Sequence, residues 1–359
     1  MLTIEMLPAA QGDCLWIEYG AKDDVRRVLI DGGTKGTYKA ALRDRVAALP
    51  EAQRRFELLV VTHVDSDHIG GALELVRDTK LGVKYGDIWF NGFKHLTKPD
   101  ELGPAQGDLL TDAIEKQKLT WNAAFGGKAV VVPDEGDLPS FELAGGLKLT
   151  LLSPTRTQLA KLRPVWEKVT KRAGMVEGVE AEPDQEELAA QGPSDVLGDD
   201  INVPALADTK FKPDGAEANG SSIALLLELD KKKLVLGADA HAPVLIASIQ
   251  RLLGGKKGKL RVDAVKLPHH GSRNNVSTDL IGLLDSGRYL FSTNGSIYKH
   301  PDREAVARVI QYGGERPSLF FNFRSTLNEV WDDAGLKKKY RYDAEYPPKG
   351  EAGIQIDVK

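Results

Sequence analysis

The chain has 359 residues, of which 42% are apolar and 28% charged, a composition typical of a globular protein with a sizeable buried core. The formal net charge of −4 gives no overall basic footprint, so composition alone does not argue for a nucleic-acid partner. The single cysteine, Cys14, excludes an intramolecular disulfide and a cysteine-rich zinc site, so any metal must be held by histidines and carboxylates. The N-terminus lacks a secretory-signal pattern, and no apolar run reaches the ~18 residues of a membrane span. We therefore expect a cytoplasmic protein without membrane segments.

The first strands of the chain are predicted to lead into a cluster of histidines and aspartates. Short apolar or β-branched runs, separated by Gly, Asp and Pro, predict strands at Thr3–Leu7, Cys14–Tyr19, Arg27–Ile30 and Phe56–Thr62. The last run is continuously apolar, as expected of a strand buried on both faces. It ends in His63-Val-Asp65-Ser-Asp67-His68, and a helical pattern begins at Gly70. We therefore place the cluster on a strand-to-helix loop, where side chains of a rigid scaffold can converge.

The middle of the chain combines further strands with a long acidic stretch. Strands are predicted at Ile88–Asn91, Ala129–Val132 and Leu147–Leu152, and a helix between residues 155 and 172. From about Glu177 to Asp214 the chain is rich in Glu and Asp and poor in apolar residues. Such a composition is typical of a solvated loop, so we interpret this stretch as a mobile insertion rather than a partner site.

The remainder of the chain alternates strands with helices. A hairpin is predicted from Ser222–Leu229 and Lys233–Leu236, followed by the helices Ala242–Leu253, Ser277–Leu284 and Arg303–Tyr312. The strands between and after them are Asp263–Leu267, Tyr289–Ser292, Leu319–Phe323 and Gly353–Val358. Because strands precede the alternation in both halves, we predict an α/β fold of the αββα type, with two packed mixed sheets sandwiched by outer helices. We expect a single domain over residues 1–359, with insertions at about 85–145 and 177–214.

Histidines and aspartates gather at the predicted strand ends. Of the seven histidines, five lie there beside Asp, Gly or another His, namely His63, His68, His269, His270 and His300. Similar positions are occupied by Asp31, Asp65, Asp67 and Asp239. Histidines that serve packing would be scattered over the interiors of elements instead. Imidazoles and carboxylates that converge at one sheet edge repel one another or lose hydration unless a cation compensates them, so the pattern predicts a metal site.

The motifs of the chain resemble those of the metallo-β-lactamase superfamily. The run from His63 to His68 resembles its HxHxDH signature, with Asp65 in place of the second histidine. The supporting motifs follow in the expected order, as Leu29-Ile-Asp31-Gly-Gly33, Gly237-Ala-Asp239 and His269-His270-Gly-Ser272. The nearest resemblance is to the hydrolase domain of the bacterial competence channel protein, which takes up DNA. It rests on Gln11-Gly12-Asp13, the HxDxDH variant, Asn219-x-x-Ser222, the HHGS sequence and His300-Pro301.

The resemblance implies two adjacent divalent metal ions, zinc or manganese. One metal would be held by Asp67, His68 and one histidine of the pair His269–His270, between which the sequence does not decide. The other would be held by His63 and Asp65, and the bridging ligand of both would be Asp239.

The resemblance also implies roles beside the metals. Asp31, Asn219 and Ser222 would support the loops that carry the ligands. Asp67 or Asp65 would orient the attacking water or receive its proton. His300, at the rim, would contact the substrate or stabilise the leaving group, although a residue before Pro301 is equally typical of a helix N-terminus.

Two departures from the superfamily pattern bear on the metal. The usual third-motif histidine is missing, because the corresponding stretch reads Asn219-Gly-Ser-Ser222. With Asp65 also replacing an imidazole, the site around His63 becomes rich in oxygen. Oxygen ligands suit harder cations such as Mn²⁺ or Mg²⁺ better than Zn²⁺. We predict that one or both sites prefer manganese, or that one binds zinc only weakly.

These features predict a metal-dependent hydrolase whose nucleophile is a metal-bound hydroxide. An oxygen-rich two-metal site fits a phosphodiester better than a β-lactam, so the favoured function is a phosphodiesterase, with nucleic acid as the candidate substrate of a nuclease. One alternative is a hydrolase of a small phosphoester or another metabolite. The other is a metal-binding or degenerate regulatory subunit of a multi-protein system such as phage defence, in which the acidic insertion docks a partner protein. The expected partners are therefore a nucleic-acid substrate or a docked protein, and the sequence predicts no particular oligomeric state.

Overall fold

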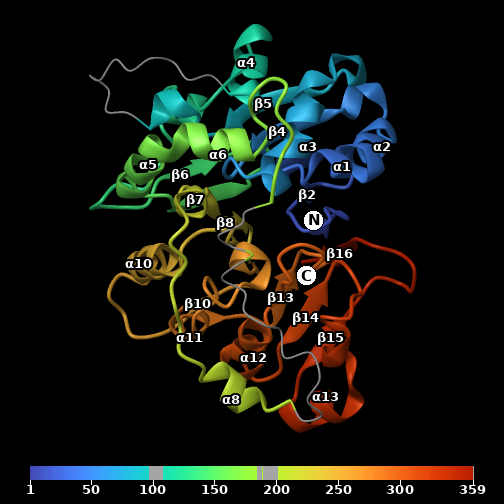
Figure 1. The fold of residues 1–359 in the computed structure, drawn as a ribbon, viewed down its shortest axis with the longest axis vertical. Helices are drawn as coiled ribbons and strands as arrows, with labels where there is room; N and C mark the ends of the chain where they lie inside the picture. Colours follow the sequence, from blue (N-terminus) through green and yellow to red (C-terminus); the bar gives the residue numbers. More distant parts are fainter. Residues whose placement is uncertain (97–107, 184–187, 189–200, 359) are drawn as a thin grey trace.

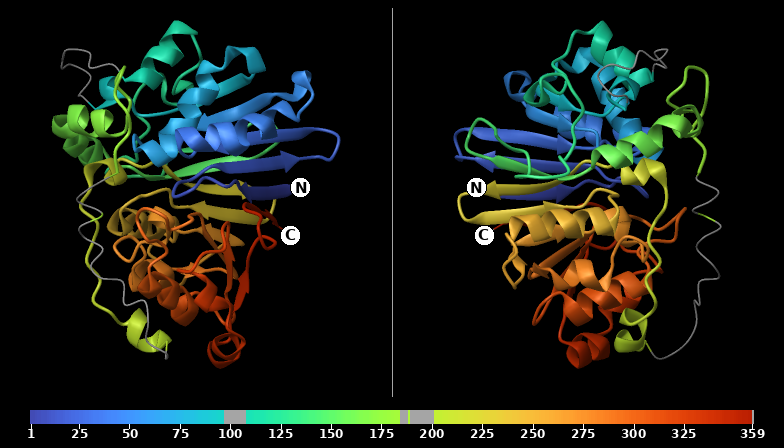
Figure 2. Two further views of the ribbon diagram at one scale, coloured as in Figure 1. Left: turned by 45° about the vertical axis from the view of Figure 1, so that its right-hand side comes forward. Right: turned by 90° about the vertical axis from the view of Figure 1, so that its left-hand side faces the viewer.

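The computed structural model describes residues 1–96, 108–183, 188 and 201–358. It contains two large β-sheets, which are stacked in the middle of the molecule with helices on both outer sides (Figures 1 and 2). This arrangement confirms the predicted αββα fold class. Within the described part, none of the helices has the length and apolarity needed to cross a membrane.

The first sheet has six strands in the order β16-β1-β2-β3-β4-β5. Their bounds are β1 Leu2–Met6, β2 Leu15–Gly20, β3 Val25–Ile30, β4 Arg55–Val60, β5 Lys84–Trp89 and β16 Ile354–Asp357. Strands β3, β4 and β5 run parallel, whereas β16, β1, β2 and β3 pair antiparallel. The last strand of the chain therefore closes the sheet that the first strand begins, and both termini lie close together (Figure 2).

The second sheet has eight strands in the order β15-β14-β13-β11-β9-β8-β7-β6. Their bounds are β6 Ser140–Glu142, β7 Lys148–Ser153, β8 Ala224–Leu229, β9 Lys232–Leu236, β11 Ala264–Lys266, β13 Arg288–Phe291, β14 Ser318–Phe321 and β15 Asp343–Glu345. The strands from β9 to β15 run parallel, and those from β6 to β9 antiparallel. A small parallel pair joins β10 (Leu260–Arg261) to β12 (Leu284–Asp285).

The main core lies between the two sheets, and strand β4 shows how it is built. Leu58 and Val60 point into the core between the sheets. Leu59 and Val61 point the other way, into a second core under the helices. All four side chains are fully buried, which is why the end of β4 and the residue after it are apolar at consecutive positions rather than at alternate ones.

Helices cover the outer faces of both sheets (Figures 1 and 2). Those on the side of the first sheet are α1 Lys35–Thr37, α2 Arg43–Ala47, α3 Ser66–Arg77, α4 Leu109–Lys116, α5 Arg156–Leu162, α6 Trp166–Arg172 and the short α9 Glu217–Gly220. Those on the side of the second sheet are α8 Val203–Ala207, α10 Ala242–Leu252, α11 Thr278–Gly282, α12 Arg303–Tyr312 and α13 Ala334–Tyr340.

Two of the sequence expectations are wrong in detail. Residues 129–132 form no strand, because the backbone N–H and C=O of Val130 bond the side chain of Asn91 at 2.8 and 2.9 Å instead of a neighbouring strand. Helix α3 begins at Ser66 rather than at Gly70. Asp67 and His68 therefore lie in the first turn of a helix and not on a loop.

Candidate metal centre

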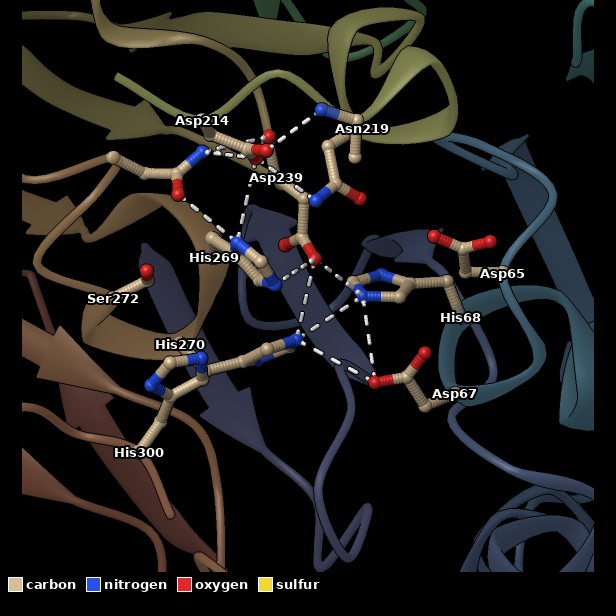
Figure 3. A network of polar contacts seen from close by, with 12 residues as sticks. Asp65, Asp67, His68, Asp214, Asn219, Asp239, His269, His270, Ser272 and His300 are labelled. Carbon is tan, nitrogen blue, oxygen red and sulfur yellow. Dashed lines mark hydrogen bonds and ion pairs between the residues drawn. The ribbon is translucent and has the colours of Figure 1, made fainter. Parts of the chain in front are cut away.

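The predicted site residues lie beyond the carboxyl ends of parallel strands in both sheets. Asp31 follows β3, His63 follows β4, Asp239 follows β9, and His269 and His270 follow β11. Figure 3 shows side chains from both halves of the chain pointing toward one another. Such strand ends are where ligands usually bind in α/β sheets. The fold therefore gathers residues far apart in the sequence at one place.

Close backbone contact fixes the loop that precedes α3. A Cβ atom on Gly12 would lie 1.7 Å from the carbonyl oxygen of Asp67, so only glycine fits there. The next residue, Asp13, donates its backbone N–H to the same oxygen at 3.2 Å. The Gln11-Gly12-Asp13 run thus has a structural role, because it packs the connection between β1 and β2 against the first turn of α3.

Hydrogen bonds at Nδ1 set the tautomer of His68 and His270. Nδ1 of His68 lies 2.8 Å from Oδ2 of Asp31, and Nδ1 of His270 lies 2.8 Å from the carbonyl oxygen of Ser292. An ionised carboxylate and a carbonyl have no proton to donate, so both Nδ1 atoms must carry one. In the neutral rings, the free lone pair is then on Nε2.

The same assignment follows for His63 by way of Thr62. Thr62 uses its hydroxyl proton on Oδ2 of Asp31 at 2.8 Å, so its oxygen accepts from Nδ1 of His63 at 3.0 Å. His269 is fixed by Asn275, whose Nδ2 donates to Asp214 at 3.0 Å. The Asn275 Oδ1 therefore accepts from Nδ1 of His269 at 2.9 Å. All four rings present Nε2 as the free atom.

These Nε2 atoms surround a single carboxylate oxygen, Oδ2 of Asp239. The distances are 3.2 Å for His68, 3.4 Å for His270, 3.8 Å for His63 and 3.8 Å for His269. Asp239 is buried, and Figure 3 shows its carboxylate among the histidine rings. Lone pairs facing a buried carboxylate repel it, so the arrangement requires a proton or a cation between them.

Asp67 completes a second group around the same centre. Its Oδ2 lies 3.7 Å from Nε2 of His270 and 4.0 Å from Nε2 of His68. The Nε2 atoms of those two histidines are only 3.2 Å apart. Two lone pairs cannot bond each other, which again calls for a positive charge between them.

The residues present fit a divalent cation. The ligand atoms of Asp67, His68 and His270 all lie within 4.8 Å of one another, and so do those of His63, His68 and Asp239. Among the described residues, Nε2 of His63 and Oδ1 of Asp239 are buried and have no hydrogen-bond partner. Buried polar atoms are rarely left in this state, and imidazole nitrogens with carboxylate oxygens are the ligands of zinc and manganese.

Asp65 lies at the edge of the centre, between a histidine and an arginine. Its Oδ2 is 3.5 Å from Nε2 of His63, and its Oδ1 is 3.3 Å from Nη2 of Arg172. Asp65 is also the residue before the first turn of α3. The structure thus brings it next to His63, as the resemblance implies, but gives one of its oxygens to α6.

The charges of the centre shift several pKa values. Burial raises the pKa of Asp67. Burial acts the same way on Asp239, but the surrounding His68, His270 and His269 hold the pKa of Asp239 well below its usual range. Burial alone would lower the pKa of His68, yet the carboxylates of Asp239, Asp67 and Asp31 raise it well above its usual value. The surrounding histidines therefore keep Asp239 anionic, and the carboxylates in turn favour positive charge on His68.

The sequence interpretation missed Asp214. Its Oδ2 accepts hydrogen bonds from Nδ2 of Asn219 at 2.9 Å and Nδ2 of Asn275 at 3.0 Å, and it lies 3.6 Å from Nδ1 of His269. Asp214 lies at the end of the stretch that we interpreted as a mobile insertion rather than a partner site. Residues 184–187 and 189–200 of this stretch lie outside the described residues.

The remaining predicted residues lie around the centre rather than in it. Asn219 holds Asp214, and Ser222 is fully buried two residues before β8. The ring of His300 lies edge-on to that of His269 at 5.2 Å, and its Nδ1 is 3.5 Å from Asp302. His241 also lies near this group, with its Nε2 3.9 Å from Oδ2 of Asp214.

A buried ion pair lies behind His270 and was also missed. Lys266, on β11, donates to Oδ2 of Asp13, and both side chains are buried. Oδ1 of Asp13 is 3.4 Å from Nδ1 of His270. A lysine within an apolar strand gives no sequence signal of a partner 253 positions away.

Comparisons with known proteins give a family match over part of the chain and several similar solved structures. Residues 7–155 match the family model described as the metallo-beta-lactamase superfamily. Similar solved structures include zinc-bound PqqB from Methylobacterium extorquens, with 12% identity, coverage of 99% of this chain and 100% of that one, and a TM-score of 0.44. Human tRNase Z, short form, is 8% identical with 99% coverage of both chains and a TM-score of 0.40. The metallo-β-lactamase fold protein YhfI from Bacillus subtilis is 11% identical with 99% coverage of both chains and a TM-score of 0.39.

No curated protein matches the chain. The matching family model is that of the whole superfamily, so the closer resemblance to the competence channel hydrolase stays a prediction. The match begins after β1 and ends just beyond β7, and it includes the run from His63 to His68. The match and the two sandwiched mixed sheets are consistent with the metallo-β-lactamase fold.

Proposed function

We propose that the chain is a metal-dependent hydrolase that acts on a phosphodiester. The observation that carries the proposal is the convergence of four imidazole Nε2 atoms, within 3.8 Å, on one oxygen of Asp239. Because the tautomers leave each Nε2 lone pair free, the centre is prepared for cations rather than for hydrogen bonds. The fold hosts many different hydrolytic reactions, so the site and not the fold must decide the chemistry.

We assign the ligands to two sites that share Asp239. Asp67, His68 and His270 would hold one cation, and His63, Asp65 and His269 the other. Both histidines of the pair are then used, and His269 takes the place of the missing third-motif imidazole. The distance of 3.8 Å from His269 Nε2 to Asp239 Oδ2, equal to that from His63, supports this assignment.

When bound, divalent cations act as Lewis acids that lower the pKa of coordinated water and stabilise charge on phosphoryl oxygens. We expect the protein's own residues to limit the access of bulk water, because His68, Asp239 and His270 are buried. We assign to Asp67 and Asp65 the orientation of the attacking water and the acceptance of its proton. We assign to His300, beside His269, a contact with the leaving oxygen.

The donor set also bears on the choice of metal. In our assignment each site has two imidazoles and at least two carboxylate oxygens, whereas catalytic zinc sites often have three nitrogen ligands. Oxygen-rich sites favour harder cations. We therefore keep the expectation that manganese supports activity at least as well as zinc.

A chelator-treated protein tests the proposal. Reloading with Mn²⁺ or Zn²⁺ should restore about two ions per chain and turnover of bis(p-nitrophenyl) phosphate, DNA or RNA. Asp67→Ala should lower both bound metal and turnover, the latter by more than ~100-fold, since even residues behind the ligands are worth 10- to 100-fold. Asp134→Ala, at an exposed position, is the matched control. No turnover of any phosphodiester with either metal would refute the proposal.

A second candidate is the hydrolysis of a small phosphoester or another metabolite. It is favoured by one observation, a cleft of about 830 Å³ beside the centre, because this volume falls within the range of small-molecule pockets. The same substrate panel separates the two candidates, since a small-substrate enzyme would turn over monomeric phosphoesters faster than any oligonucleotide.

A further inference from the structure

The cleft of about 830 Å³ begins where the metal centre ends. Ser66, Ala173, Glu182 and Tyr298 line both the cleft and the small space at the centre. Because that space is only about 10 Å³, about the size of one water molecule, it cannot hold a whole substrate. The rest of any substrate must therefore extend into the neighbouring cleft.

Helix α3 forms one wall of the cleft along its whole length. The helix residues that line the cleft recur on one face, at Ser66, Gly70, Leu73, Glu74 and Arg77. The same helix carries two candidate ligands, Asp67 and His68, in its first turn. From Ser66 to Arg77 the helix rises by ~16 Å. The cleft thus starts at the reacting centre and extends along α3. The length of this helix equals the span of several consecutive phosphates of one nucleic-acid strand.

Three cationic side chains line the same side of the cleft, which we call the cationic wall, and all three lie on helices. Lys35 belongs to α1, Lys39 to the helical turn that follows it, and Arg77 to the last turn of α3. Lys35 is 3.6 Å from Glu74. Among the described residues, neither Lys39 nor Arg77 has a carboxylate within the 4.0 Å of an ion pair. Two charges are therefore available to an anionic ligand, on a scaffold that does not need to rearrange.

The opposite wall is an acidic loop, residues 173–183. Glu177, Glu180 and Glu182 lie on it, and all three are exposed. Backbone hydrogen bonds tie it to α6 at its two ends, from Met175 to Thr170 at 2.8 Å and from Glu182 to Arg172 at 2.8 Å. Acidic side chains on a loop facing cations on helices are complementary in charge.

We propose that this cleft binds the phosphate chain that flanks the scissile phosphodiester, and that the acidic loop competes with that chain for the cationic wall. The proposal rests on the proposed function and names its substrate class, an oligonucleotide rather than a single organic phosphate. Phosphates would lie along α3 toward Arg77, and Glu177 and Glu180 would lose their attraction to the wall when the chain is bound.

Substrate length gives the first test. Oligonucleotides with the same scissile bond and increasing numbers of flanking nucleotides should show a falling KM, relative to a dinucleotide, until the cleft is filled. In Lys35→Ala/Lys39→Ala/Arg77→Ala the ratio of the dinucleotide KM to the long-oligonucleotide KM should approach one. Lys256→Ala/Lys257→Ala removes two exposed cations outside the cleft and should keep the wild-type ratio.

Binding without turnover gives the second test. A fluorescent single-stranded oligonucleotide in EDTA should bind with a log Kd that depends linearly on log salt, with ~0.7 of slope per phosphate neutralised. The triple variant should lose ~1.4 from this slope, because it removes the two available charges, and Glu177→Gln/Glu180→Gln should bind more tightly than wild type. The opposite sign for the two variants would indicate a cationic ligand and overturn the proposal.

The two proposals fail in different ways. If no phosphodiester is turned over but the oligonucleotide binds with the expected charge dependence, the proposed hydrolysis fails and the cleft assignment stands. If phosphodiesters are turned over and neither KM ratio nor salt slope responds to the cationic wall, only the cleft assignment is overturned. Equal turnover of monomeric and long substrates would also overturn it, in favour of a small phosphoester.

Discussion

At the scale of single residues, the candidate centre depends on atoms that do not face it. Each of the four imidazoles donates from Nδ1 to a fixed acceptor, and this leaves Nε2 as the atom that faces Asp239. Asp31 serves two of them, because it accepts from His68 directly and from Thr62, which in turn accepts from His63. Outer partners of this kind commonly control metal affinity.

We expect Asp31→Asn to weaken metal binding by ~10- to 100-fold, as for other residues that orient metal-ligating histidines. The amide would place an N–H group against the Nδ1–H of His68 or leave that proton without an ionised acceptor, and the favoured tautomer would be lost. Competition with a chelating dye measures the change. The matched control is Asp87→Asn, which removes a buried carboxylate that accepts from Trp89 and from three backbone N–H groups. It should cost stability but keep metal affinity, and equal losses of metal affinity in both variants would contradict the prediction.

A histidine away from the centre gives a pH-dependent stability. Burial, with a smaller contribution from Lys94, lowers the pKa of His95 to about 4. The unfolded chain, with a pKa near 6.5, then binds more protons than the folded chain between pH 4 and 6.5. Stability from this group is complete above pH 6.5 and is lost as the pH falls toward 4, by about 3 kcal/mol.

We expect His95→Asn to lose this pH dependence, as measured by urea unfolding at pH 7 and pH 4.5. Asp108 titrates in the opposite sense in nearly the same range, because burial raises its pKa to about 6. The difference between variant and wild type, rather than the wild-type curve alone, therefore isolates His95. A variant whose stability changes with pH as steeply as that of wild type would show that His95 is not the group responsible.

At the scale of elements, the strands that carry the site were predictable and the helix contacts were not. Apolar runs followed by His or Asp predicted β4, β9 and β11, because the burial of a strand can be predicted from the hydrophobicity of its own residues. The start of α3 was placed four residues late, since His63 to His68 reads as polar and a helix with buried polar residues gives no amphipathic pattern. Asp214 was missed because its partners, Asn219, Asn275 and His269, come from the fold.

Helix α3 packs closely against the loop after β3 through Gly71 and Gly32, and this contact gives a prediction at the scale of elements. Gly71 lies inside α3, where alanine would by propensity alone add stability. A Cβ at Gly71 would, however, lie 2.0 Å from the carbonyl oxygen of Gly32. We expect Gly71→Ala to destabilise the fold by ~1 to 3 kcal/mol, as overpacking does, and to weaken metal binding, because α3 carries Asp67 and His68.

Gly282 is the matched control for that substitution. It also lies in a helix, α11, but a Cβ there would meet nothing within 4 Å. Gly282→Ala should raise the unfolding free energy by ~0.5 to 1 kcal/mol, since only the helix propensity changes. Thermal unfolding of both variants should show a lower stability for Gly71→Ala and a higher stability for Gly282→Ala. A stabilising Gly71→Ala would mean that α3 can move away from the loop freely.

At the scale of the whole molecule, the centre exists only where the two halves meet. Asp67 and His68 come from the first half, and Asp239, His269 and His270 from the second. The halves are joined at this place by Asp13 and Lys266, a buried pair with one member on each side. Burial would raise the pKa of Asp13, but Lys266 and His270 hold it well below its usual range. The carboxylate therefore stays charged and depends on its partners.

We expect Lys266→Met to destabilise the protein by ~3 to 5 kcal/mol, because it leaves the buried charge of Asp13 uncompensated. Adding Asp13→Asn removes that charge, so the double variant should recover a large part of the loss even though it lacks the ion pair. Denaturant unfolding of the two single variants and the double variant gives the coupling between them. Additive losses would mean that the pair contributes as two independent side chains.

Metal affinity then distinguishes two roles of the Asp13–Lys266 pair. The pair could contribute to stability alone, or it could also align the metal ligands of the two halves. Asp13 also contacts His270 and, through its backbone, Asp67, so it links one candidate ligand from each half. If the pair holds those ligands in register, the double variant should regain stability yet keep a weakened metal affinity, since neither Asn nor Met restores a charge behind His270. If instead metal affinity returns together with stability, the ion pair acts on folding alone. The register of the two halves must then be set by the packing of the sheets.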